Sequence, residues 1–117
     1  MKGLLSNKTR VHHILDAISE IETYIENVTE DQFLQNSEKR FATIKQIEII
    51  GEACNKLTDE LKLAHPDIPW LQVIGFRNIS IHEYHNVSFH IVWGIATKDL
   101  PALKNQMELL KNELTET

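Results

Sequence analysis

Apolar side chains recur three or four positions apart along most of this chain, the spacing that places them on one face of an α-helix. One such stripe predicts a first helix over residues 9–28, and a second stripe predicts another helix that begins near residue 36 or 37. His65-Pro66 is expected to end the second helix, because a residue that precedes proline disfavours the helical conformation. The two stripes consist of Val11, Ile14, Ile18, Ile21, Ile25 and Val28, and of Phe41, Ile44, Ile47, Ile50, Cys54, Leu57 and Leu61.

The second half of the chain predicts two further helices, each associated with an Asp-x-Pro sequence. In Asp67-Ile68-Pro69 and Asp99-Leu100-Pro101, the aspartate can cap free backbone N–H groups, and the proline suits the first helical turn. We expect the third helix from about residue 69 through residue 77, and the fourth from residue 86 or 88 with a bend or restart at residue 99. The last part carries a heptad-like seam that packs either on the first helix or on a partner helix. The seam consists of Leu100, Leu103, Met107, Leu110 and Leu114.

Together these elements predict an all-α fold, an antiparallel bundle of four main helices of which the last is interrupted. The 117 residues match the size of a single domain, which we expect to span residues 1–117. Thr29-Glu30-Asp31-Gln32 has the form of a capping box that opens a short turn. Gly51 lies within the second apolar stripe, where it costs about 1 kcal/mol of helix propensity relative to alanine. Close approach by a neighbouring helix would compensate for that cost.

Composition and charge narrow the functional class. Apolar residues make up 42% and charged residues 25% of the chain, as in globular proteins and unlike disordered ones. The single cysteine, Cys54, lies on an apolar stripe and allows no internal disulfide. No stretch has the apolar character of a transmembrane helix or a secretion signal, so we expect a cytoplasmic protein that binds no membrane. The formal charge of −5 argues against a general nucleic-acid coat but permits a local cationic site.

Polar side chains that can carry chemistry are concentrated in residues 75–85, a segment flanked by apolar positions. On an ideal helix, at about 100° per residue, Asn78 and His82 share a face, whereas Arg77 and His82 diverge by roughly 140°. Arg77 and His82 can therefore converge only if the helix ends between them or if a second copy of the domain completes the site. Two candidate helix caps shortly after His82 support a break in the helix there.

Arg77 and His82 have the chemistry that metal-free cleavage of a phosphodiester needs. Histidine accepts and donates a proton near neutral pH, and arginine donates two parallel hydrogen bonds to phosphate oxygens. His82 would deprotonate a ribose 2′-hydroxyl that attacks the adjacent phosphorus, while Arg77 would stabilise the charged phosphorane. The alternative is structural: both side chains could bond to helix ends beside an aromatic cluster, because an arginine and a histidine five positions apart form a weak pattern.

Other candidate ligands give weaker signals. His12 and His13 face different sides of a helix, and no metal-binding spacing accompanies His82, His85 and His90, so we expect no metal site. The sequence contains no glycine-rich phosphate loop, and we expect no cofactor. Both tryptophans are expected to pack within the bundle rather than to stack on nucleic-acid bases.

A longer motif surrounds the arginine and the histidine. Arg77, His82 and Tyr84 form an R-x4-H-x-Y sequence, and Asn78 directly follows the arginine. In this motif, and in further short matches along most of its length, the chain resembles the HEPN domains of the HepT-like toxin family. These small helical proteins are encoded beside an MntA-type nucleotidyltransferase antitoxin. The further matches are His13-Ile14-Leu15, Ala17-Ile18, Ile50-Gly51-Glu52-Ala53, Pro69-Trp70, Val92-Trp93 and Asp99-Leu100-Pro101.

The resemblance implies a HEPN-like fold and a metal-independent endoribonuclease that cuts RNA and acts as a growth-inhibiting toxin. It implies a homodimer in which two pairs of catalytic residues, Arg77 and His82, face each other across a cleft, with Asn78 as a supporting residue that orients His82. It further implies that an MntA-like nucleotidyltransferase antitoxin transfers AMP to Tyr84, which would exclude RNA by bulk and by charge. On an acidic body, we expect that cleft to be locally basic.

The alternative to an enzyme is a protein that binds a partner without catalysis. A HEPN-like bundle can serve as a non-catalytic binding module that docks a nucleotidyltransferase or a nucleotide without cutting RNA. The two interpretations differ in their need for His82, since cleavage requires it and docking does not.

Overall fold

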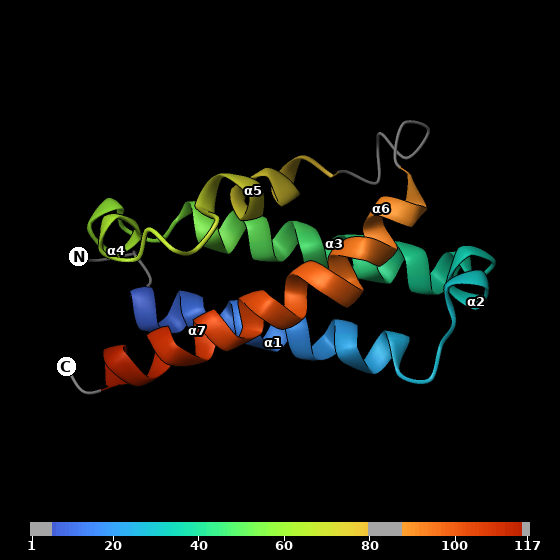
Figure 1. The fold of residues 1–117 in the computed structure, drawn as a ribbon, viewed down its shortest axis with the longest axis horizontal. Coiled ribbons are helices and arrows are strands. Elements are labelled where there is room, and N and C mark those ends of the chain that lie inside the picture. The colour runs from blue at the N-terminus through green and yellow to red at the C-terminus, as the bar shows by residue number, and fades with distance from the viewer. Residues whose placement is uncertain (1–5, 80–87, 116–117) are drawn as a thin grey trace.

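The computed structural model describes residues 6–79 and 88–115, and every regular element within these ranges is helical. The predicted all-α fold is therefore confirmed (Figure 1). In the described part of the chain, no helix combines the length and the apolar character needed to cross a membrane. The elements are α1 (Asn7–Ile25), α2 (Glu30–Leu34), α3 (Ser37–Asn55), α4 (Asp59–Ala64), α5 (Trp70–Gly75), the 3₁₀ turn η1 (Phe76–Asn78), α6 (Phe89–Gly94), the π-helical turn η3 (Ile95–Asp99) and α7 (Leu100–Thr115).

The long helices α1, α3 and α7 pack together, and α5 with η1 lies along the other side of α3 (Figure 1). The four predicted main helices correspond to α1, to α3, to α5 with η1, and to the path from α6 through η3 to α7. Their apolar stripes face one another and exclude water, which is the main source of stability in such a bundle. The core includes Val11, Ile14, Ile18, Ile21, Phe33, Ile44, Ile47, Ile50, Cys54, Val73, Phe76, Val92, Leu100, Leu103, Met107 and Leu110.

The seam on α7 packs on α1 of the same chain, as the first of the two interpretations predicts. Its leucines and Met107 are buried or half-buried in the common core. At the surface between the two helices, the ammonium of Lys104 lies 3.0 Å from the carboxylate of Glu22. The seam is therefore occupied by intrachain packing.

Two backbone features determine the connection between α1 and α2. The helix α1 ends at Ile25, three residues before the predicted end, because Asn27 takes a left-handed conformation with a φ of 58° that a right-handed helix cannot continue. Thr29 then caps α2. Its hydroxyl accepts from the backbone N–H of Gln32 at 3.2 Å, and the Gln32 side chain accepts from the backbone N–H of Thr29 at 2.9 Å. The predicted capping box is confirmed.

The second predicted helix is in fact two helices, so its expected continuation to His65-Pro66 is wrong. The helix α3 ends at Asn55, and α4 begins at Asp59 with Thr58 as its N-cap. The Thr58 hydroxyl accepts from the backbone N–H of Leu61 at 3.3 Å, and the Asn7 side chain accepts from the backbone N–H of Thr58 at 3.1 Å. The threonine that caps α4 therefore separates it from α3, although the apolar stripe continues across this break in the helix.

The second half differs from the prediction in its helix starts. At the beginning of α5, Pro69 is itself the N-cap residue and no side chain caps it, so the capping role expected for Asp67 is wrong. Asp99 caps nothing either, because α6, η3 and α7 form one continuous helical path. A regular α-helix would bring the ring of Pro101 against the carbonyl group four residues earlier, and the wider π-helical turn before it relieves this clash. The predicted start of α6 after Ser88 is confirmed.

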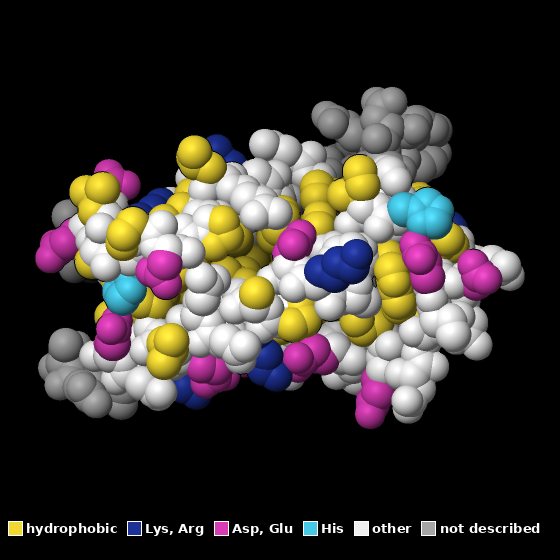
Figure 2. Space-filling view, viewed as in Figure 1, with side chains coloured by type: hydrophobic (Ala, Val, Ile, Leu, Met, Phe, Trp, Pro, Cys, Tyr) yellow, Lys and Arg dark blue, Asp and Glu magenta, His cyan; other side chains and the backbone are white. Residues whose placement is uncertain are grey.

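A hollow of about 190 Å³ lies between α5 and α7 on the face shown in Figure 2, where apolar side chains line its floor. Val73, Phe76 and Leu103 contribute to this lining, while Lys98 and Asp99 reach it from η3. Of the described residues that line it, Lys98 and Asp99 carry ionisable groups, and none is a histidine or has a hydroxyl side chain.

Candidate functional site

Arg77 owes its position to an unusually close contact between its own backbone and α3. The contact is made at Gly51: a Cβ atom there would lie 2.4 Å from the backbone N of Arg77 and 3.0 Å from the carbonyl C of Phe76. It would also lie 3.0 Å from the carbonyl O of Val73. Only glycine permits this approach. The prediction that a neighbouring helix approaches Gly51 is confirmed, and that neighbour is the segment that carries Arg77.

The helix that carries Arg77 ends one residue after it. The turn η1 stops at Asn78, and Ile79 takes an extended conformation with φ −81° and ψ 96°. This end lies between Arg77 and His82, which meets one of the two conditions for their convergence. The helix therefore does not continue regularly from Asn78 through Ile79. His82 and Tyr84 lie outside the described residues, and so does the expected orientation of His82 by Asn78.

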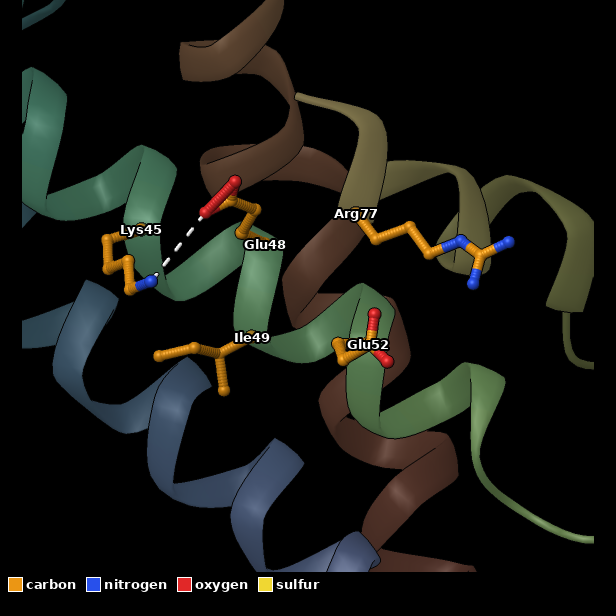
Figure 3. Close-up of a pocket in the computed structure, with 5 residues that line it drawn as sticks. All are labelled: Lys45, Glu48, Ile49, Glu52 and Arg77. Atoms are coloured by element: carbon orange, nitrogen blue, oxygen red, sulfur yellow. Dashed lines mark ion pairs between the residues drawn. The ribbon is translucent and has the colours of Figure 1, made fainter. Parts of the chain in front are cut away.

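Arg77 borders an open cavity of about 280 Å³ on the surface of α3 (Figure 3). The other lining residues are Lys45, Glu48, Ile49 and Glu52, all from α3. The ammonium of Lys45 lies 3.8 Å from the carboxylate of Glu48, and the side chain of Arg77 extends along α3 on the side of Glu52. These α3 side chains have no local sequence pattern that marks them as site residues, since only the folded chain brings them beside Arg77.

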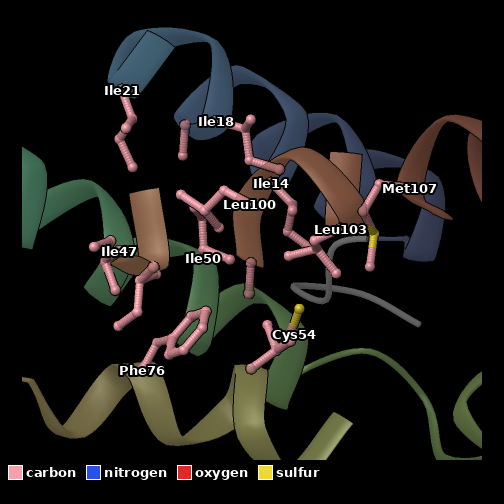
Figure 4. Packing of buried hydrophobic residues seen from close by; sticks show 14 of the residues in the cluster. Ile14, Ile18, Ile21, Ile47, Ile50, Cys54, Phe76, Leu100, Leu103 and Met107 are labelled. Carbon is pink, nitrogen blue, oxygen red and sulfur yellow. The ribbon is translucent and has the colours of Figure 1, made fainter. Parts of the chain in front are cut away.

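The neighbours of Arg77 leave its guanidinium available. Phe76, the preceding residue, is 5% exposed and packs into the core near Ile47 and Ile50 (Figure 4), which anchors η1. Arg77 itself is exposed, and within residues 6–79 and 88–115 it makes no side-chain hydrogen bond or ion pair. An anchored backbone with an unengaged guanidinium suits the recognition of an anion such as phosphate.

The charge around Arg77 is balanced rather than basic. Lys45 and Arg77 oppose Glu48 and Glu52 in the wall of the cavity. This part of the surface is therefore less acidic than the chain as a whole, whose formal charge is −5. The cavity by itself does not provide the basic cleft that we expected.

Several side chains have structural roles, as predicted. Burial raises the pKa of the Cys54 thiol to about 12, so this cysteine is protonated at neutral pH and behaves as a small apolar side chain. The indole N–H of Trp70 donates to the carbonyl O of His65 at 2.9 Å, and the Trp93 ring lies 5.1 Å from that of Phe33. Both tryptophans are integrated into the bundle.

Nothing in the described part of the chain forms a group of three or more His, Cys, Asp or Glu side chains that could hold a metal ion. His90 is engaged instead, since its Nδ1 lies 2.5 Å from the carboxylate of Glu30 and links α6 to α2. His82 and His85, the other members of the histidine set considered from the sequence, lie outside the described residues.

Comparison with known proteins gives a consistent result. The family model described as "Ribonuclease HepT-like" matches residues 14–110. The chain is 34% identical over 106 residues to "Probable ribonuclease HepT" of Thermococcus cleftensis, a match that covers 91% of this chain and 96% of that protein. It is 29% identical over 103 residues to "Putative RNase MJ1380" of Methanocaldococcus jannaschii, covering 88% of this chain and 94% of that protein. No solved structure matches the chain.

Proposed function

Since the chain belongs to the HepT-like ribonuclease family, we propose that it is an endoribonuclease that cuts RNA without a metal ion and acts as the toxin of a toxin–antitoxin pair. The observation that carries the proposal is the family match over residues 14–110, within which Arg77 stands exposed beside a cavity. Arg77 and His82 are the catalytic residues, and Asn78 is a supporting residue next to them.

The proposed reaction needs only these side chains and the RNA. The imidazole of His82 takes the proton from a ribose 2′-hydroxyl, and the freed oxygen forms a bond to the adjacent phosphorus. Arg77 stabilises the negative charge of the phosphorane. The bond from phosphorus to the 5′-oxygen then breaks, and that oxygen takes a proton from imidazolium or water. The products carry a 2′,3′-cyclic phosphate and a 5′-hydroxyl group.

We also propose that the active protein is a homodimer with the two catalytic pairs facing one cleft. Support for this arrangement comes from the family resemblance. Geometry alone does not require it, because the helix already ends at Asn78 and one chain can then bring Arg77 and His82 together. A second copy would add a second Arg77 to the same cleft and strengthen its binding of RNA.

RNA cleavage in the presence of EDTA tests this proposal. The unmodified protein should cut single-stranded RNA and leave cyclic phosphate ends, since no metal takes part. Intact mass establishes beforehand that the protein carries no AMP. If unmodified protein cuts none of a varied set of RNAs, the ribonuclease proposal fails. The non-catalytic module that docks a nucleotidyltransferase or nucleotide then becomes the better account.

Tyr84 is the proposed site of inactivation. An MntA-like nucleotidyltransferase should transfer AMP from ATP to the Tyr84 hydroxyl, forming an O–P bond and releasing pyrophosphate. Incubation of the two proteins with ATP should raise the mass of the chain by one or more AMP groups and abolish cleavage, because the added bulk and negative charge exclude RNA. Intact mass spectrometry and the cleavage assay measure both effects.

The chain offers a matched control for this experiment. Its only other tyrosine is Tyr24, whose hydroxyl accepts from the Gln46 side chain at 3.3 Å. The Tyr24→Phe variant should gain AMP like the wild type, whereas the Tyr84→Phe variant should gain none. Transfer to Tyr84→Phe would place the modification elsewhere.

A further inference from the structure

A second cavity, of about 200 Å³, adjoins the one beside Arg77 and opens between α1 and α3. Arg10 and His13 line it from α1, and Lys56, the C-cap residue of α3, lines it on the other side. Ile49 and Glu52 line both cavities. The two cavities therefore form one continuous surface that crosses α3, with Arg77 at one end and Arg10 at the other.

The arginines of the chain differ in what they contact. Arg40 is engaged, because its guanidinium donates to the carbonyl O of Leu34 and lies 4.6 Å from the centre of the Phe89 ring. Arg10 and Arg77 make no side-chain hydrogen bond or ion pair within the described residues. The two arginines whose side chains bond to no described residue are thus the two that border the joined cavities.

The joined surface is more cationic than either the Arg77 cavity or the chain as a whole. Besides Arg10 and Arg77, its lining includes Lys45 and Lys56, while Glu48 and Glu52 supply the carboxylates among the described residues that line it. The ammonium of Lys56 lies 3.6 Å from the carboxylate of Glu52, but both side chains are about half exposed, so solvent screens this pair. A net positive surface on a chain of charge −5 favours a polyanion at this place.

We propose that Arg10 binds a second backbone phosphate of the RNA whose scissile phosphate lies at Arg77. The proposal rests on the proposed ribonuclease function and deepens it by assigning a binding site on α1. A guanidinium presents two parallel N–H groups that match two oxygens of one phosphate, and an RNA strand presents such groups at each nucleotide. His13 and Lys56 border the same cavity and add donors or charge to it. Arg10 takes no part in bond cleavage.

RNA binding and cleavage by an Arg10→Ala variant test the proposal. Because alanine favours the helix, α1 should remain folded, which circular dichroism and the melting temperature will establish. In the His82→Ala background, fluorescence anisotropy with a labelled single-stranded RNA should show a Kd about 5- to 10-fold higher when Arg10 is replaced. The slope of log K against log salt concentration should fall by about 0.7, the contribution of one phosphate contact to a single strand. With His82 present, KM should rise by the same factor while kcat stays unchanged.

Two further variants make the test specific. Arg10→Lys keeps the charge and should restore most of the affinity. Lys98→Ala removes an exposed cation from the separate hollow between α5 and α7 and should leave Kd unchanged. An unchanged Kd in Arg10→Ala, or an equal loss in Lys98→Ala, would overturn the proposal. A change of oligomeric mass in Arg10→Ala, measured by light scattering, would overturn it in favour of a protein–protein interface.

The outcomes separate this proposal from the proposed function. If the wild type cuts RNA and Arg10→Ala behaves like the wild type, only the Arg10 site fails. If the wild type cuts no RNA but Arg10→Ala weakens its binding, the ribonuclease activity fails and the binding surface on α1 and α3 stands.

Discussion

Replacing Arg77 by alanine should lower the rate of RNA cleavage about 10³-fold, because the phosphorane would lose its cationic partner. The loss of stability should be small, since the Arg77 side chain is exposed and bonds to no other described residue. His82→Ala should cause a loss of similar size by removing the proton acceptor, about 10²- to 10⁴-fold. Single-turnover cleavage in EDTA, with folding checked by circular dichroism, measures both effects.

A conservative variant distinguishes the role of the guanidinium from that of its charge. Arg77→Lys keeps the positive charge but loses the two parallel hydrogen bonds, so it should cut RNA at a rate between those of wild type and Arg77→Ala. Lys98→Ala serves as the control for the loss of a cation that does not line this cavity. Retention of metal-free cleavage in Arg77→Ala or His82→Ala would remove that residue from the catalytic mechanism.

The sequence predicted the buried faces of the helices well, because burial of one helix face places apolar residues three or four positions apart in the sequence. Ile14, Ile47 and Met107 lie in the core where their stripes place them. The helix breaks were harder to predict. Thr58 caps a new helix inside a continuing apolar stripe, and Pro101 is accommodated by a π-helical turn rather than by a restart. Neither the helix break at Thr58 nor the π-helical turn changes the spacing of the apolar residues, so that spacing does not reveal them.

The candidate site was predictable only in part, for a different reason. The motif identified Arg77 from a short local pattern, and the place of Gly51 in an apolar stripe indicated a close neighbour. The surface around Arg77, however, is assembled from α1, α3 and η1, which are separated by tens of residues in the sequence. Nothing local in the chain connects Arg10 with Arg77. The two arginines come to border one surface only when the helices pack.

The contact at Gly51 leads to the second large effect that we expect, from the Gly51→Ala variant. The added Cβ atom would lie 2.4 Å from the backbone N of Arg77, so α5 and η1 must move away from α3. Overpacking of this kind lowers the free energy of unfolding by about 1–3 kcal/mol. The better helix propensity of alanine offsets about 1 kcal/mol of this loss. We therefore expect the free energy of unfolding to fall by up to about 2 kcal/mol and the cleavage rate to fall about 10²-fold, because a displacement near 1 Å misplaces Arg77.

Urea unfolding and single-turnover cleavage measure these two quantities, at a temperature where the variant is fully folded. Gly75→Ala and Gly94→Ala are matched controls: a Cβ atom at either position meets nothing within 4 Å, and both backbones are helical, with φ of −60° and −62°. Each should be stabilised by up to about 1 kcal/mol and should cut RNA at the wild-type rate. A loss of stability in Gly51→Ala without a loss of rate would show that Arg77 can move with its helix and still act. The catalytic role would then depend on the guanidinium alone, and the close packing at Gly51 would serve stability only.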